Sequence, residues 1–223
     1  MPRVKLGVLI SGSGSNLQSI IDHIEDGRLE AEIRVVISNV PGAYGLIRAE
    51  KHGLKTVVVD HRGFAARTEF DARLVEVLRE HEVELVVLAG FMRVLTPTLL
   101  EAFPGRLMNI HPALLPSFPG VHVWQKAIDC GVRFSGCTVH FVDQGTDTGP
   151  IIIQAVVPVL DDDDADSLAA RILRQEHRIY PRAIQLYAEG RLEVEGRRVK
   201  VRPLDRSQDP ARLVNPALAE AGD

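Results

Sequence analysis

The sequence predicts an α/β fold with an open, mostly parallel, doubly wound sheet and an antiparallel extension toward the C-terminus. In the first half, short β-branched runs alternate with segments of helical spacing, which is typical of βαβ units. These runs are continuously apolar, as expected for strands that helices cover on both faces. In the second half, Gly136–Val142 and Ile151–Val159 are β-rich and close in sequence, which indicates an antiparallel hairpin.

The elements of the first half follow one another without an internal repeat. The predicted strands are Val4–Ile10, Ile33–Ile37, Thr56–Val59, Leu85–Leu88 and Leu107–Ile110. The predicted helices are Asn16–Glu25, Ala43–His52 and Glu69–Glu80. The last helix is amphipathic and should pack against the sheet, because its spacing aligns Phe70, Leu74, Val77 and Leu78 on one face.

The second half begins with a proline-rich segment that must be a loop. The predicted elements are the loop His111–Gly120, the helix Val121–Cys130, the hairpin named above, the long helix Ser167–Glu189 and a terminal hairpin over Leu192–Val201. The acidic run Asp161–Asp164 precedes the long helix, and carboxylates stabilise a helix N-terminus. We expect one domain over residues 1–202 and a flexible tail over residues 203–223, which is polar and holds three prolines.

The composition excludes several classes of protein. With 45% hydrophobic and 25% charged residues, the 223-residue chain is ordinary globular protein rather than a disordered or fibrous one. The net charge of −4 leaves no basic excess to neutralise nucleic-acid phosphates. No stretch approaches the roughly 18 apolar residues of a membrane span. Cys130 and Cys137 are expected to be reduced, buried small hydrophobes, and the chain is expected to be cytoplasmic.

A glycine-rich loop, Ser11-Gly12-Ser13-Gly14-Ser15-Asn16, lies between the first predicted strand and helix. Glycines allow a tight turn and close approach of a ligand, and a helix N-terminus offers N–H groups to an anion. A dinucleotide is disfavoured, because Leu17 replaces the third glycine and the second strand ends without an acidic residue. The Walker lysine is also missing, so a single phosphate fits better. Ser15 or Asn16 is also expected to cap the helix. The alternative reading of the loop is a helix-start turn without a ligand.

Polar side chains gather where the strand Leu107–Ile110 ends. Asn109 and His111 are two positions apart and should face the same side, at the edge where open α/β sheets bind ligands. Asp147 lies in a later glycine-rich turn, and a carboxylate beside His111 would favour the imidazolium form. Amide, imidazolium and carboxylate together suit acyl transfer. Spacing alone leaves open whether Asp147 reaches His111, and whether His111 is structural.

Two other chemistries are disfavoured. A serine hydrolase would need a G-x-S-x-G elbow, which the sequence lacks. The wide spacing of His111, His122 and His140, without H-x-x-x-H or C-x-x-C, argues against a metal site.

Five segments together resemble the phosphoribosylglycinamide formyltransferase family. They are Gly12–Leu17, Leu88–Leu95, Asn109–Pro116, Gly136–Val142, and Gln175-Glu176-His177 followed by Tyr180-Pro181. They occur in the family's order with similar spacing, and the resemblance covers about residues 4 to 195. It implies a Rossmann-like formyltransferase fold with a ribonucleotide-phosphate half, residues 1–110, and a catalytic and folate half, residues 111–202. It also implies a cis peptide bond before Pro116.

The resemblance assigns roles residue by residue. The implied catalytic trio is Asn109, His111 and Asp147. The ribonucleotide would be bound through its phosphate by Gly14, Ser15 and Asn16, and near its glycinamide end by Gln175 and Glu176. The implied folate-binding residues are Arg67, Met92, Arg93, Val94, Leu95, Asn109, Asp143, Gln144, Gly145, Thr146 and Asp147.

The implied reaction is transfer of the formyl group of 10-formyltetrahydrofolate to phosphoribosylglycinamide in purine biosynthesis, without a metal. Small-molecule substrates are then the only expected partners, with no nucleic acid or membrane, and the chain would be a monomer or a homodimer. Three alternatives are a methionyl-tRNA formyltransferase-like enzyme, a formyltetrahydrofolate hydrolase-like enzyme and a non-catalytic nucleotide-binding module. Methionyl-tRNA formyltransferase should carry an RNA-binding domain and a basic surface, which the acidic chain does not indicate.

Overall fold

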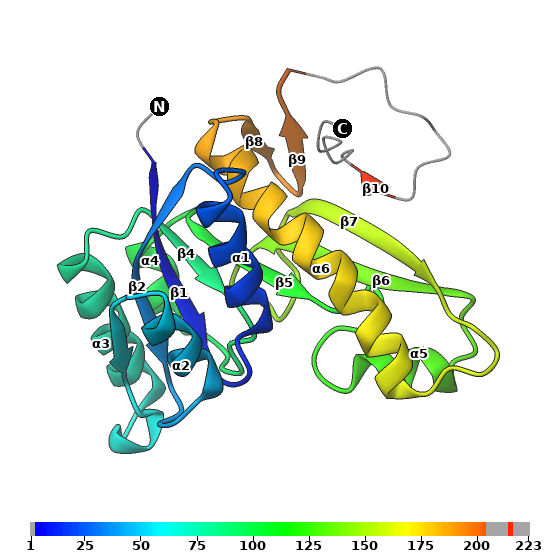
Figure 1. Ribbon diagram of the computed structural model, residues 1–223, viewed down its shortest axis with the longest axis horizontal. Coiled ribbons are helices and arrows are strands. Elements are labelled where there is room, and N and C mark those ends of the chain that lie inside the picture. Colours follow the sequence, from blue (N-terminus) through cyan, green and yellow to red (C-terminus); the bar gives the residue numbers. More distant parts are fainter. Residues whose placement is uncertain (1–2, 204–213, 216–223) are drawn as a thin grey trace. The chain divides into compact units, whose positions relative to one another are not determined.

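The computed structural model describes residues 3–203 and 214–215 and divides the chain into two compact units (Figure 1). Of the described residues, the first unit comprises 3–109 and 141–144, and the second comprises 110–140, 145–203 and 214–215. In the described ranges, no helix has both the length and the apolar character needed to cross a membrane. The predicted α/β class is confirmed.

The first unit is built on a parallel sheet. Its strands are β1 (Val4–Ile10), β2 (Ala31–Ser38), β3 (Thr56–Val58), β4 (Leu85–Leu88) and β5 (Leu107–His111), which enters the second unit at Ile110. Their order is β3-β2-β1-β4-β5, and each neighbouring pair is parallel. The order reverses between β1 and β4, so this unit has a topological switch point there. Crevices that bind ligands form at such points, outside the carboxyl ends of the strands.

Helices of the first unit pack in two pairs. They are α1 (Ser15–Glu25), α2 (Tyr44–Lys51), α3 (Arg67–Glu80) and α4 (Pro97–Ala102), with a 3₁₀ turn, η1 (His61–Gly63). The first pair is α1 with α2, and the second is α3 with α4. Phe70, Leu74, Val77 and Leu78 of α3 are all buried in the core, as their spacing predicts. Burial of this apolar face against the sheet is the main stabilisation of α3.

The second unit contains the antiparallel elements. Its strands are β6 (Phe134–Phe141, of which Phe141 belongs to the first unit), β7 (Ile151–Pro158), β8 (Leu192–Glu195), β9 (Arg198–Val201) and β10 (Val214–Asn215). The pairs β6–β7, β8–β9 and β10–β7 are antiparallel, which confirms both predicted hairpins, and β7–β9 is parallel. Gly136 permits the β6–β7 approach, because a Cβ there would collide with the Ala155 carbonyl.

Two helices complete the second unit, α5 (Val123–Asp129) and α6 (Ala165–Ala188), and they pack against each other. Asp164 caps α6 by accepting a hydrogen bond from the Ser167 backbone N–H at 2.8 Å. The last residue of the acidic run therefore stabilises the start of this helix. Leu168, Ile172 and Ile179 of α6 are buried.

Three expectations differ from the structure. Helix α4 was not predicted, because its six residues are too few to show a period. The α1 N-cap is Gly14, so the prediction that Ser15 or Asn16 caps this helix is wrong. Cys137 is buried but Cys130 is exposed at the end of α5, where the chain turns after Asp129. The predicted tail lies largely outside the described residues, apart from Pro203 and β10.

Candidate active site

The loop between β1 and α1 is shaped by a close contact between two glycines. Gly14 adopts a left-handed conformation with φ of 68°, and a Cβ there would lie 2.6 Å from the Gly45 Cα. The Gly45 N–H donates to the Gly12 carbonyl at 3.0 Å, and Arg48 Nε donates to the Ser13 carbonyl at 2.9 Å. The start of α2 therefore fixes the conformation of this loop.

The same loop is open on one side. A Cβ on Gly12 would meet nothing within 4 Å, so a ligand can approach the backbone at this residue. The helix behind it begins at Ser15 without a capping hydrogen bond from any side chain in the described part of the chain. An uncapped helix N-terminus beside open backbone is a suitable site for an anion such as a phosphate.

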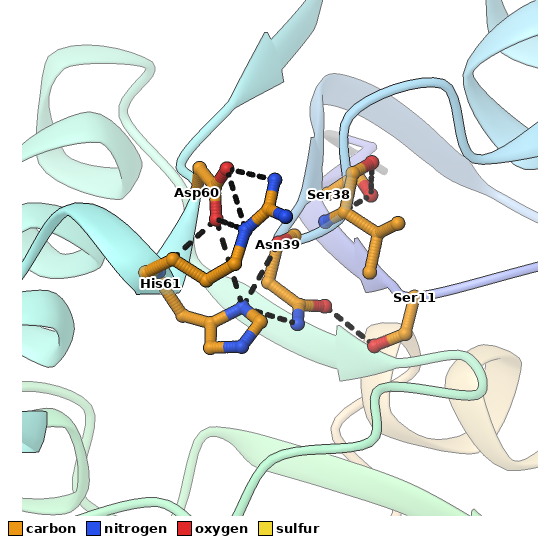
Figure 2. A network of polar contacts seen from close by, with 7 residues as sticks. Ser11, Ser38, Asn39, Asp60 and His61 are labelled. Atoms are coloured by element: carbon orange, nitrogen blue, oxygen red, sulfur yellow. Dashed lines mark hydrogen bonds and ion pairs between the residues drawn. The ribbon is translucent and has the colours of Figure 1, made fainter.

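Neighbouring strand ends in the first unit are joined by a polar network (Figure 2). Ser11 Oγ donates to Asn39 Oδ1 at 2.6 Å, and Asn39 Nδ2 lies 3.2 Å from His61 Nδ1. Asp60, beside His61, has its pKa lowered to about 2, chiefly by hydrogen bonds from Arg62. Asn39 and His61 carry no local sequence signal of a role, because only the fold brings the ends of β1, β2 and β3 together.

The predicted folate-binding residues of the first unit lie on two segments. Arg67 begins α3, and the segment Met92–Leu95 follows β4. The side chains of Met92 and Val94 are 70% and 61% exposed. Exposed apolar side chains beside a topological switch point provide a surface for an aromatic ligand.

The remaining predicted residues of the first unit lie at strand ends. Asn109 is half-buried on β5, in register with Leu88 of β4. Asp143 and Gln144 follow β6, where the Val142 N–H donates to the Leu107 carbonyl at 3.0 Å.

In the second unit, His111 and Asp147 lie together. His111 is 5% exposed, and its Nδ1 is 3.4 Å from Asp147 Oδ2. The same carboxylate oxygen accepts from the Gly120 N–H at 2.9 Å. His140 is also buried, and its Nε2 lies 3.9 Å from Asp147 Oδ1. Asp147 has a left-handed φ of 56°, so the turn holds this side chain at some cost in backbone energy.

Both ring nitrogens of His111 face oxygen atoms. Nε2 lies 2.8 Å from the Phe118 carbonyl, which only accepts hydrogen bonds, so Nε2 carries a proton. Nδ1 faces the Asp147 carboxylate, which also only accepts when ionised. Both ring nitrogens of His111 therefore lie beside hydrogen-bond acceptors, one from the backbone and one from a carboxylate.

The loop that follows His111 is anchored by two polar side chains, the buried Thr138 and the half-buried Gln154. Thr138 Oγ1 donates to the Ala113 carbonyl at 2.7 Å and accepts from the Leu115 N–H at 3.1 Å. Gln154 Nε2 donates to the Leu115 carbonyl at 2.9 Å and to Thr138 Oγ1 at 3.0 Å. The Leu115–Pro116 peptide bond is cis, as the resemblance predicts. Sequence reasoning missed the roles of Thr138, Gln154 and His140.

Other predicted site residues of the second unit lie on α6 and on the β6–β7 loop. Gln175 accepts from Arg178 at 3.3 Å, and Glu176 is 6% exposed. Gly145 and Thr146 are exposed on the loop. Burial, aided by the negative charge of Glu176, raises the pKa of the Cys137 thiol, so this cysteine stays protonated and does not act as a nucleophile.

No group of three or more His, Cys, Asp or Glu within residues 3–203 and 214–215 could hold a metal ion. The first unit thus has a glycine-rich loop with an uncapped helix N-terminus after β1, and the second unit has the pair of His111 and Asp147. On an α/β fold, an anion-accepting helix N-terminus and a histidine–carboxylate pair are typical of enzymes that act on anionic substrates.

Comparison with known proteins gives the family. Residues 4–184 match the formyl transferase family model, so the chain belongs to the formyl transferase family.

Solved structures and curated proteins that are similar to this chain were also found. Glycinamide ribonucleotide transformylase 1 from Symbiobacterium toebii is 52% identical, with a TM-score of 0.88 over 89% of this chain and 94% of that one. Phosphoribosylglycinamide formyltransferase of Escherichia coli (strain K12) is 44% identical over 84% of this chain and 88% of its own length. The trifunctional purine biosynthetic protein adenosine-3 of Drosophila melanogaster is 50% identical, but the chain spans only 14% of that protein's length.

Proposed function

We propose that this chain is a phosphoribosylglycinamide formyltransferase. It transfers the formyl group of 10-formyltetrahydrofolate to the glycinamide amine of phosphoribosylglycinamide, giving formylglycinamide ribonucleotide and tetrahydrofolate in purine biosynthesis. The observation that carries this proposal is the 44% identity to a relative of that name, since the match spans 88% of the relative. The paired His111 and Asp147 supply groups that this chemistry needs.

The reaction begins when the neutral glycinamide nitrogen attacks the formyl carbon. The carbonyl electron pair moves to oxygen, and a tetrahedral oxyanion forms. Asn109 and the imidazolium of His111 donate hydrogen bonds to this oxyanion, since residues two apart on a strand face the same side. The Nε2–H that donates to the Phe118 carbonyl is the donor for this role once the oxyanion replaces that carbonyl.

The tetrahedral intermediate then collapses. The attacking nitrogen loses a proton, the leaving N10 of the folate gains one, and the bond from N10 to the formyl carbon breaks. Asp147 keeps His111 charged and orients a water that carries this proton. No enzyme nucleophile is needed, and Cys137 is held as a thiol by its buried surroundings.

The substrate sites follow the assignment made from the sequence. The backbone at Gly14, Ser15 and Asn16 binds the phosphate, and Gln175 and Glu176 meet the glycinamide end. Arg67, Asn109 and Met92–Leu95 bind the folate, with backbone of residues 143–147 around the pterin. The loop conformation set by Gly14, together with the open approach at Gly12, supports the phosphate assignment.

The proposed partners are these two small molecules alone, and the proposed compartment is the cytoplasm, with the chain acting as a monomer or a homodimer.

A spectroscopic assay tests the function. The chain is mixed with 10-formyl-dideazafolate and phosphoribosylglycinamide, each omitted in turn, and release of the deformylated folate is followed. Turnover should require both compounds. Formyl release with water alone would indicate a hydrolase, and transfer only to methionyl-tRNA would indicate the tRNA enzyme. Ligand binding without turnover would indicate a binding module.

A further inference from the structure

The Ser11 hydroxyl lies at the meeting point of two segments that are proposed to bind different substrates. Ser11 directly follows β1 and opens the phosphate loop. The segment Met92–Leu95 follows β4, the parallel neighbour of β1. The two segments therefore leave adjacent strands on the two sides of the topological switch point.

Ser11 is bonded to the β4 segment through both its backbone and its side chain. Its N–H donates to the Gly90 carbonyl at 3.1 Å, and its Oγ accepts from the Met92 N–H at 2.8 Å. The Ser11–Met92 bond joins residues 81 positions apart in the chain. Displacement of Met92 consequently displaces the first residue of the phosphate loop, and the reverse also holds.

The direction of the Ser11 hydroxyl proton is fixed by its partners. A serine hydroxyl has one proton, and the Met92 N–H already occupies an acceptor position. The proton is therefore donated to Asn39 Oδ1 at 2.6 Å. Asn39 is 3% exposed, and His61 on its other side limits rotation of the amide. Figure 2 shows Ser11 and Asn39 in this arrangement.

The other end of the folate segment has a separate anchor. Asp71 of α3, 1% exposed, accepts from the Thr96 N–H at 2.6 Å and from Thr96 Oγ1 at 2.7 Å. Burial raises the pKa of Asp71, which the hydrogen bonds from Thr96 and the charge of Arg93 oppose. Neither of these Asp71 bonds reaches the phosphate loop. One end of the segment is thus anchored through Ser11 and the other through Asp71.

We propose that Ser11 is a positioning residue that couples the two substrate sites, with its hydroxyl joining the ribonucleotide loop to the folate segment. The inference rests on the substrate sites proposed above. When one substrate orders its segment, the Ser11–Met92 bond orders the other segment in advance, and the second substrate binds at a smaller entropic cost. By linkage, each substrate tightens binding of the other by the same factor.

The factor by which one substrate tightens binding of the other can be estimated from the strength of the Ser11–Met92 hydrogen bond. A protein hydrogen bond shifts an equilibrium by roughly two- to twelve-fold. We expect coupling of roughly fivefold, because one side-chain bond joins the segments directly and the backbone bond to Gly90 persists in a Ser11→Ala variant.

The experiment is titration calorimetry on the full chain. The dissociation constant of phosphoribosylglycinamide is measured with and without saturating dideazafolate, which carries no formyl group and cannot react. The ratio of the two constants is the coupling factor. It should be roughly fivefold for the unmodified chain and should fall to within about twofold of one in Ser11→Ala. Ser11→Thr, which keeps the hydroxyl, should retain it.

Thr96→Val is the matched control, since it removes one side-chain hydrogen bond at the other end of the segment and keeps the backbone bond to Asp71. It should weaken dideazafolate binding and leave the coupling factor unchanged. Thermal unfolding checks that every variant is folded.

Equal coupling in Ser11→Ala and the unmodified chain would overturn the proposal. So would independent binding of the two ligands, or equal loss of coupling in Ser11→Ala and Thr96→Val. An unmodified chain that bound neither ligand would overturn the proposed function as well.

Discussion

Replacing Asp147 by Asn tests whether the carboxylate keeps His111 charged. The substitution preserves the size of the side chain and an oxygen for the Gly120 N–H, and it removes the negative charge. Nδ1 of His111 lies 3.4 Å from Asp147 Oδ2, and at this distance an effective dielectric constant of about 20 gives an attraction of about 5 kcal/mol. If about half survives desolvation, the rate should fall by roughly 100-fold.

The loss should appear in kcat, because the hydrogen bond to the oxyanion strengthens only in the transition state. Steady-state kinetics with 10-formyl-dideazafolate should show both KM values changing much less than kcat. Nitrogen NMR at neutral pH should show the His111 ring moving from the imidazolium toward the neutral form. Asp162→Asn is the control, since it removes the same charge from an exposed site before α6 and should leave kcat unchanged.

His111→Asn should cost about as much as Asp147→Asn. The double variant should lose far less than the product of the two factors, because the two residues act as one unit. Near-normal kcat in Asp147→Asn, or a ring that stays an imidazolium in that variant, would refute this reasoning.

Further outcomes are expected from substitutions at four positions. Gly12→Val should raise KM for the ribonucleotide and leave KM for folate unchanged, because the new side chain enters the open space beside the β1–α1 loop. Gly14→Val should raise KM for the ribonucleotide too. In addition, it should lower the unfolding temperature, since a backbone φ of 68° disfavours residues with a side chain. Equal changes of both KM values in Gly12→Val would contradict the loop assignment. Glu176→Ala should raise KM for the ribonucleotide by roughly tenfold or more while folate binding persists, and unchanged kinetics would remove Glu176 from the site. Asp164→Ala should lower the unfolding temperature by roughly 2–4 °C near neutral pH and by less in strong acid. Hydrogen bonds from Ser167 lower the pKa of Asp164, so the stabilisation by the ionised cap is lost as the pH falls through that lowered pKa. A decrease in unfolding temperature that did not depend on pH would argue against the ionised cap.

Helix α3 was predictable, because its stabilisation comes from burial that the helical spacing of its apolar residues records. Strands β1 and β4 were predictable as continuous apolar runs, which is the pattern of strands buried on both faces. Helix α4 was missed, although Thr96-Pro97 resembles a helix start, with an extended residue before a proline at the first helical position. The α1 cap was mistaken because Ser15 and Asn16 have good capping propensity, yet the turn requires a left-handed residue at Gly14.

Contacts between site residues that are far apart in the sequence could not be predicted from local patterns. Asp147 is 36 residues from His111, and only the resemblance pointed to their pairing, which the structure contains. The bonds of Ser11 to Asn39 and of Asp71 to Thr96 join residues 28 and 25 positions apart. Such contacts depend on how strands are ordered in the sheet, and no local pattern in a single sequence encodes that order. The proposed roles of the substrate-binding residues stay predictions.

The unequal burial of the two cysteines has a practical use. Cys137 is enclosed on β6 as a neutral thiol, whereas Cys130 is exposed after α5, and the chain has only these two. A maleimide dye should therefore attach at one position of the unaltered protein, without removal of native cysteines. Because Cys130 belongs to the second unit, a fluorophore there gives that unit its own optical signal.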